Sequence, residues 1–179
     1  MKLASGENVL TLKDIAKMVA FSDSETNVSR AMRQIRHWTQ NDLLKTVSEK
    51  STGKGIPRLY AEDPTLDIAA ILMELSRLIP AIEVLKPVAD DLYESWEGSH
   101  PYLHSALADD EVFLQVYWNT DPDTGSITGV EFKFWDERDD LEDRMPNPAP
   151  ACSVLINMAR VADRIYGVSR STGGSDADE

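Results

Sequence analysis

Apolar residues recur at helical spacing in two segments near the N-terminus. The first segment, residues 11 to 20, predicts a short helix that Thr11 can cap. Its apolar positions are Leu12, Ile15, Ala16 and Val19. After a turn at residues 21 to 24, a second helix is expected from about Glu25 to Gln40. Its apolar face consists of Val28, Met32, Ile35 and either Ala31 or Trp38.

Residues 45 to 60 change pattern and predict two short strands on either side of the tip "STGKG". Gly53 and Gly55 permit a tight turn at this tip. Pro57 restricts the return strand to the edge of a sheet, because proline has no backbone N–H to donate. We therefore expect a two-stranded hairpin directly after the second helix.

The remainder of the chain predicts further helices and a second hairpin. Helices are expected from residue 64 to about Arg77 and again after Pro80, where Pro87 interrupts or restarts the second one. Residues 111 to 118 and 127 to 135 alternate in polarity around a turn-rich connector, which is typical of a β-hairpin. A last amphipathic helix is expected from about Ser153 to Tyr166. Its inward positions are Leu155, Met158, Val161, Ala162 and Ile165.

These elements predict an α+β fold in four parts. Residues 1–79 are expected to form an N-terminal winged helix-turn-helix domain, and residues 80–99 a helical connector. Residues 100–166 are expected to form an acidic α+β domain, in which an antiparallel β-hairpin packs on helices and which dimerises or binds an effector. Residues 167–179 are expected to be a disordered tail.

Charge is unevenly distributed along the 179 residues, whose formal net charge is −13. Residues 1–60 hold 10 Lys and Arg against 6 Asp and Glu, a balance of +4. Residues 61–179 hold 8 against 25, a balance of −17. Because phosphate repels an acidic surface, only the first third of the chain is suited to nucleic acid.

The second helix carries its charge on the side opposite its apolar face. Arginine dominates this side, and no carboxylate occurs between Glu25 and Asp42. A solvated surface is the ordinary interpretation of scattered charges, but a uniformly cationic helix after a short helix and a turn favours a binding face. The following hairpin is also basic, through Lys45, Lys50, Lys54 and Arg58.

A basic helix beside a basic hairpin predicts a protein that binds double-stranded DNA. The helix would enter the major groove while the hairpin touches phosphates alongside it. The candidate DNA-binding residues are Asn27, Arg30, Arg33, Gln34, Arg36, His37, Lys50, Lys54, Arg58 and Tyr60. A homodimer is expected, because two copies on a two-fold site double the contacts.

Three sequence segments strengthen this interpretation: "LKDIAKMVAFS", "IRHWTQNDLL" and "GIPRLYAEDP". In this order, over about residues 10 to 78, they resemble the DNA-binding domain of the MerR family of transcriptional regulators. The resemblance implies that Arg36 and Arg58 contact the DNA backbone and that Tyr60 buttresses the wing, while polar residues of the second helix read bases. It also implies a role in transcription regulation.

Other patterns indicate no cofactor, metal or enzymatic activity. His100 and His104 are four residues apart, but Pro101 and the missing third ligand weaken a metal site. Asp121 and Asp123 resemble part of a calcium loop, although a hairpin turn explains them better. The single cysteine, Cys152, excludes a disulfide within the chain and reads as a small apolar residue.

The sequence also predicts where the protein acts and leaves a second function open. No apolar run is long enough to cross a bilayer and the N-terminus lacks the core of a secretory signal, so we expect a cytoplasmic protein without membrane contact. The alternative to a DNA-binding regulator is a protein-interaction adaptor, whose acidic C-terminal half binds a partner protein. A DNA-architectural factor of a phage or mobile element would use the same winged fold.

Overall fold

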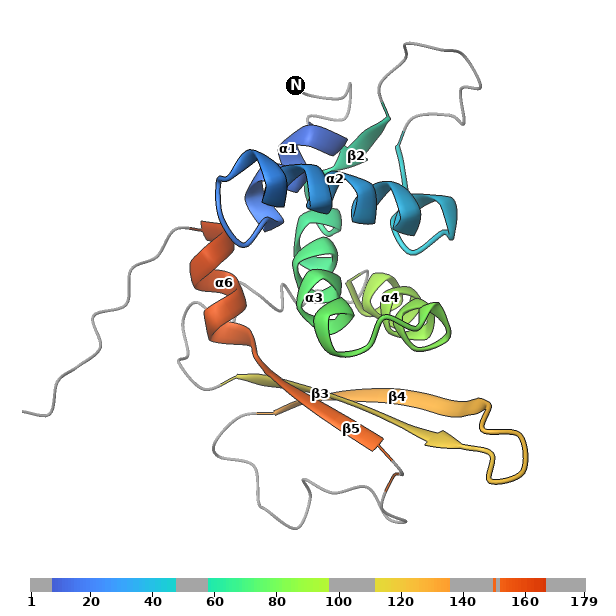
Figure 1. Cartoon of the computed structure of the whole chain (residues 1–179). Helices are drawn as coiled ribbons and strands as arrows, with labels where there is room; N and C mark the ends of the chain where they lie inside the picture. The colour runs from blue at the N-terminus through green and yellow to red at the C-terminus, as the bar shows by residue number, and fades with distance from the viewer. Residues whose placement is uncertain (1–7, 48–57, 97–111, 136–149, 151, 167–179) are drawn as a thin grey trace, which may run out of the picture.

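The computed structural model describes residues 8–47, 58–96, 112–135, 150 and 152–166 (Figure 1). It is a mixed fold of α-helices and two small antiparallel sheets. In chain order the first half contains β1 (Val9–Thr11), α1 (Leu12–Val19), α2 (Glu25–Gln40), β2 (Leu59–Ala61), α3 (Thr65–Leu78) and α4 (Ile82–Trp96). The second half contains β3 (Phe113–Thr120), β4 (Ile127–Trp135), β5 (Cys152–Asn157) and α6 (Met158–Tyr166).

Helix α3 lies at the centre of the molecule. Figure 1 shows α2 across one end of α3, the three-stranded sheet β4-β3-β5 beyond its other end, and α4 and α6 beside it. Ten of its residues are buried, so it packs on nearly every side rather than along one stripe. One hydrophobic cluster consequently extends from Ile15 in α1, through α3, to Ile165 in α6.

The last helix is fastened to α3 by polar contacts as well as by packing. The hydroxyl of Tyr166 donates to Oδ1 of Asp67 at 2.7 Å, and Arg164 forms an ion pair with Glu74. Burial and the nearby Asp67 carboxylate raise the pKa of the Tyr166 phenol, so this hydroxyl remains a donor at physiological pH. These contacts join residues about one hundred positions apart in sequence.

Most predicted helices and the C-terminal hairpin are confirmed. The second helix has the expected bounds, and its buried centre includes both Ala31 and Trp38 together with Ile35. Helix α4 continues through Pro87. Strands β3 and β4 pair in an antiparallel hairpin whose turn is closed by Asp121, because its Oδ1 accepts the backbone N–H groups of Asp123 at 2.9 Å and Thr124 at 2.8 Å.

The predicted final helix is wrong over its first part. Residues Cys152–Asn157 form β5, which pairs antiparallel with β3, and the helix begins only at Met158. Leu155, expected to point inward, is 58% exposed. Pairing with the central strand β3 satisfies the backbone hydrogen bonds of residues 152–157. This long-range pairing overrides the helical spacing of the local sequence.

The predicted N-terminal hairpin lies only in part within the described residues. Strand β2 pairs with β1, which was not predicted, through the register Leu10 opposite Tyr60. Val47 donates one backbone hydrogen bond to Leu59, at 2.9 Å. Lys45 turns to α4, where its Nζ lies 4.3 Å from the ring centre of Tyr93. The hairpin tip, with Lys50 and Lys54, lies outside the described residues. His100 and His104 also lie outside them. The division into four parts stays a prediction.

Trp38 tests how far α2 depends on the core, because its side chain is fully buried. Trp38→Ala is expected to lower the free energy of unfolding by about 3–5 kcal/mol, through lost burial and the cavity that remains. Ser29→Ala, at an exposed position of the same helix, is the control and should change it by less than about 0.5 kcal/mol. Urea denaturation followed by circular dichroism measures both variants; equal effects would contradict this packing.

Candidate nucleic-acid interface

Helix α2 is capped at both ends, so that its exposed side is held in a fixed position. Ser24 is the N-cap, and its Oγ accepts the backbone N–H of Asn27 at 3.3 Å. At the other end the Asn41 side chain donates to the carbonyl oxygen of His37 at 2.9 Å. Asp42 then adopts the left-handed conformation, with φ of 58°, which stops the helix.

The outward side of α2 is a cationic ridge. Arg30, Arg33, Arg36 and His37 are exposed, and we call these four residues the α2 ridge. Asn27 and Gln34 are half-buried on one flank of it. The Asn27 amide already donates to Ser22 Oγ at 2.6 Å. Residues 26–41 contain no carboxylate. The ridge thus presents several donors of hydrogen bonds and positive charge.

A cleft separates the ridge from α1 on one side. It encloses about 510 Å³, and three cationic side chains from three different elements line it. They are Lys13 of α1, Arg36 of α2 and Arg58, directly before β2. Among the described residues, no carboxylate lines this α1–α2 cleft, so it is suited to an anionic group.

A second cleft lies on the other side of the ridge, against α3. It encloses about 420 Å³ and is lined by Arg30, Gln34, Phe21 and Arg77, among others. The guanidinium of Arg77 lies 4.6 Å from the ring centre of Phe21, and that of Arg164 lies 4.8 Å from the same ring. Glu74 pairs with both arginines, so this α2–α3 cleft is less positive than the first.

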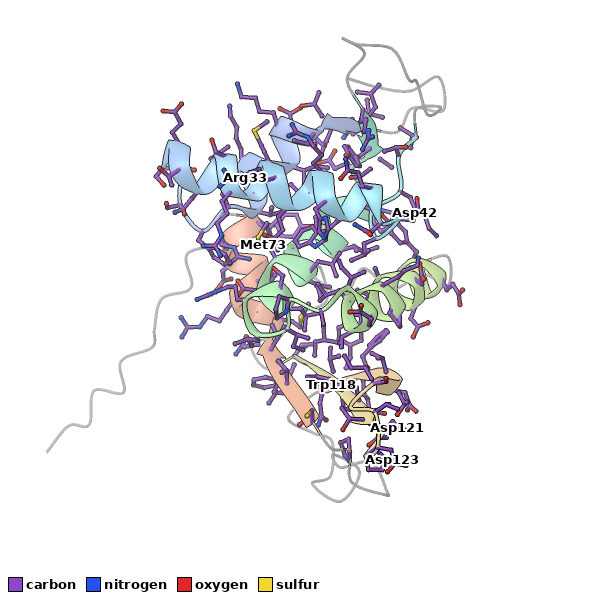
Figure 2. The ribbon with its side chains drawn as sticks, turned by 45° about the vertical axis from the view of Figure 1, so that its right-hand side comes forward. Arg33, Asp42, Met73, Trp118, Asp121 and Asp123 are labelled. Carbon is purple, nitrogen blue, oxygen red and sulfur yellow. The ribbon has the colours of Figure 1, made fainter. Side chains whose placement is uncertain are left out.

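The cations of the ridge are not matched by the protein's own carboxylates. Across the described part of the chain, the ion pairs are Arg77–Glu74, Lys86–Asp90 and Arg164–Glu74, none of which involves the ridge or Arg58. Figure 2 shows Arg33 at one end of the molecule and Asp121 and Asp123 at the opposite end. Arg33 of the ridge is therefore distant from the two carboxylates of the β3–β4 turn (Figure 2).

The structure brings together most of the predicted site residues. Arg36 and Arg58 meet in the α1–α2 cleft, and Arg30, Gln34 and Asn27 line the α2–α3 cleft. Tyr60 is fully buried beneath α2, where its hydroxyl and that of Thr39 are 2.9 Å apart. Tyr60 therefore supports the helix from below and offers no surface of its own to a ligand.

Two cleft residues escaped the sequence-based prediction. Lys13 stands second in α1 and Arg77 in the last turn of α3, where each looks like an ordinary exposed charge. The local sequence does not mark these two residues, because only the packing of α1 and α3 against α2 brings Lys13 and Arg77 to the two flanks of α2.

The described part of the chain holds no group of three or more His, Cys, Asp or Glu side chains that could bind a metal ion. Cys152 is exposed at the start of β5, rather than buried as expected. None of the described helices has both the length and the apolar character needed to span a membrane.

No family model matches the chain, and no curated protein matches it. The resemblance to MerR regulators therefore rests on the sequence segments alone.

The α1 side of the first cleft depends on a reciprocal cap. Thr11 donates to Oδ2 of Asp14 through its hydroxyl at 2.7 Å and its backbone N–H at 3.0 Å, and its Oγ1 accepts the Asp14 backbone N–H. Both hydrogen bonds lower the pKa of the Asp14 carboxyl, and the one from the Thr11 hydroxyl has the larger effect.

Thr11→Ala is expected to lower the free energy of unfolding at pH 7 by about 0.5–2 kcal/mol. Because the folded-state pKa of Asp14 lies below its unfolded value, this stabilisation exists above the unfolded pKa and disappears as the pH falls through the folded one. Urea denaturation of wild type and variant from pH 7 to about pH 3 should show the difference shrinking. A difference that stays constant across this range would contradict the role of Asp14.

Proposed function

We propose that the protein binds double-stranded DNA in a sequence-specific manner through α2, as a transcriptional regulator of MerR-like type. The observation that carries the proposal is the α2 ridge, whose arginines form no ion pair within the described residues and are flanked by a cleft on each side. A cluster of exposed cations without intramolecular ion pairs can neutralise the charge of a polyanion.

The dimensions of the ridge suit the major groove. A helix with its side chains is about 10–12 Å across, and the major groove of B-DNA is about 12 Å wide. With α2 in the groove, the two phosphate backbones would lie over the two flanking clefts. Lys13, Arg36 and Arg58 would contact one backbone, and Arg30 and Arg77 the other.

Base reading falls to the outermost part of the ridge. Arginine donates two hydrogen bonds to guanine, so Arg33 is the chief candidate on the ridge. Gln34, half-buried on its flank, is a second candidate, because a glutamine amide can donate to N7 of adenine and accept from its N6 amino group. The segment from α1 through α2 to β2 would be a helix-turn-helix with residues 45–60 as its wing, where Lys50 and Lys54 add phosphate contacts. A homodimer on a two-fold site would double these contacts and supply specificity.

The test is fluorescence anisotropy with labelled duplexes, first of random sequence and then of sequences enriched by selection from a random pool. Arg33→Ala should weaken binding to the selected duplex by about tenfold, which corresponds to one lost base contact. Arg58→Ala should lower the slope of log affinity against log salt by roughly 0.9, as expected for one phosphate contact.

Lys86→Ala is the matched control, because it also removes one cation but lies on α4, paired with Asp90. It should bind both duplexes like the wild-type chain. Unchanged affinity in Arg33→Ala and Arg58→Ala would contradict docking through α2. Absence of any salt-sensitive DNA binding would favour the adaptor function instead.

A further inference from the structure

A groove runs along the outer edge of β5, beside the C-terminal end of α3. It encloses about 400 Å³, between the end of α3 and the start of α6. Leu155, Ile156 and Asn157 line it consecutively. Because consecutive strand residues point to opposite faces, the groove follows the edge of β5 rather than one face.

This edge of β5 is open to a further strand. In the order β4-β3-β5, β5 is outermost, and within the described residues it pairs only with β3. An outermost strand presents backbone N–H and C=O groups that an added strand can pair with. Leu155, on this strand, is 58% exposed, which leaves an apolar side chain at the open edge.

The wall of the groove opposite β5 is also apolar. Leu78, the last residue of α3, is 63% exposed. The large apolar residues exposed in the described part of the chain are Phe21, Val47, Leu78 and Leu155, so half of them line this one groove. Paired exposed apolar residues of this kind mark a surface that a partner covers.

Two arginines give the groove its charge. Arg160 of α6 is exposed and forms no ion pair with the described residues. Arg77 is anchored by Glu74 at 3.3 Å and by the ring of Phe21, yet its side chain remains 59% exposed. Glu74, the one carboxylate on the groove, is already shared between Arg77 and Arg164. The groove therefore attracts negative charge.

We propose that the groove binds an extended segment of a partner protein in which apolar residues alternate with Asp or Glu. Such a segment would pair its backbone with the open edge of β5, cover Leu78 and Leu155 with its apolar side chains, and place its carboxylates on Arg77 and Arg160. A phosphate backbone would satisfy the arginines but leave both leucines exposed, so a peptide fits the groove better than DNA. The groove shares Arg77 with the α2–α3 cleft, but the inference does not require DNA binding by α2.

The probe is a fluorescein-labelled peptide of about eight residues, a typical strand length, in which Val and Leu alternate with Glu and Asp. Two control peptides carry the same composition in separate apolar and acidic blocks, or Lys in place of the acidic residues. Anisotropy with the full chain should give saturable binding of the alternating acidic peptide and none of the Lys peptide. The block peptide should bind at least about tenfold more weakly.

Variants of the full chain then locate the binding and separate it from the proposed DNA interface. Leu155→Asp and Arg160→Glu should weaken peptide binding by about tenfold or more, while Arg160→Glu keeps its affinity for DNA within about twofold. Arg33→Glu changes the net charge by the same amount as Arg160→Glu. It should weaken DNA binding and leave the affinity for the peptide unchanged. Circular dichroism checks that each variant is folded.

Three results would overturn the proposal. One is equal binding of the alternating and block peptides, which indicates charge attraction alone. Another is equal loss of peptide binding in Arg160→Glu and Arg33→Glu, which places the peptide elsewhere. The third is no peptide binding at all, together with a dimer by light scattering that Leu155→Asp dissociates, which assigns the edge to a second copy of this chain. None of these results bears on whether α2 binds DNA.

Discussion

The burial of α3 on nearly all sides is the constraint on which the rest of the structure depends. A helix whose apolar residues face every direction cannot satisfy them with one neighbour, so it requires packing partners around its whole circumference. Helix α2 covers one end, the three-stranded sheet lies beyond the other, and α4 and α6 flank it (Figure 1). The positions of the cationic ridge and of the β5 groove both follow from this central element.

This arrangement explains how an acidic chain presents a basic surface. The arginines of α2 lie opposite its buried residues, so burial of Ala31, Ile35 and Trp38 directs the charged side outward. Carboxylates such as Asp121 and Asp123 lie at the turn between β3 and β4, at the other end of the molecule (Figure 2). With a Debye length of about 8 Å at physiological ionic strength, such distant charges hardly influence each other. Net charge is thus a poor guide to the potential at the ridge.

Sequence reasoning succeeded where short-range rules determine the structure. The bounds of α2 follow from Ser24 as N-cap and from the Asn41–Asp42 stop, all of which are local. It failed where partners are distant: β1 is only three residues long and pairs with residues some fifty positions later, and β5 adopts its conformation because β3 is available. The ridge arginines were recognisable from their spacing. The clefts beside them were not, since Lys13 and Arg77 reach α2 only through tertiary packing.

The ring of Phe21 receives a guanidinium from α3 and another from α6, although it belongs to the turn that introduces α2. The orientation of α2 is therefore set in part by a residue near the end of the chain, Arg164, and not only by its own neighbours. During synthesis on the ribosome, the N-terminal third emerges well before that residue is available. The contacts that hold α2 are complete only once α6 has docked, so α6 contributes to the N-terminal region as well as to the packing of the sheet.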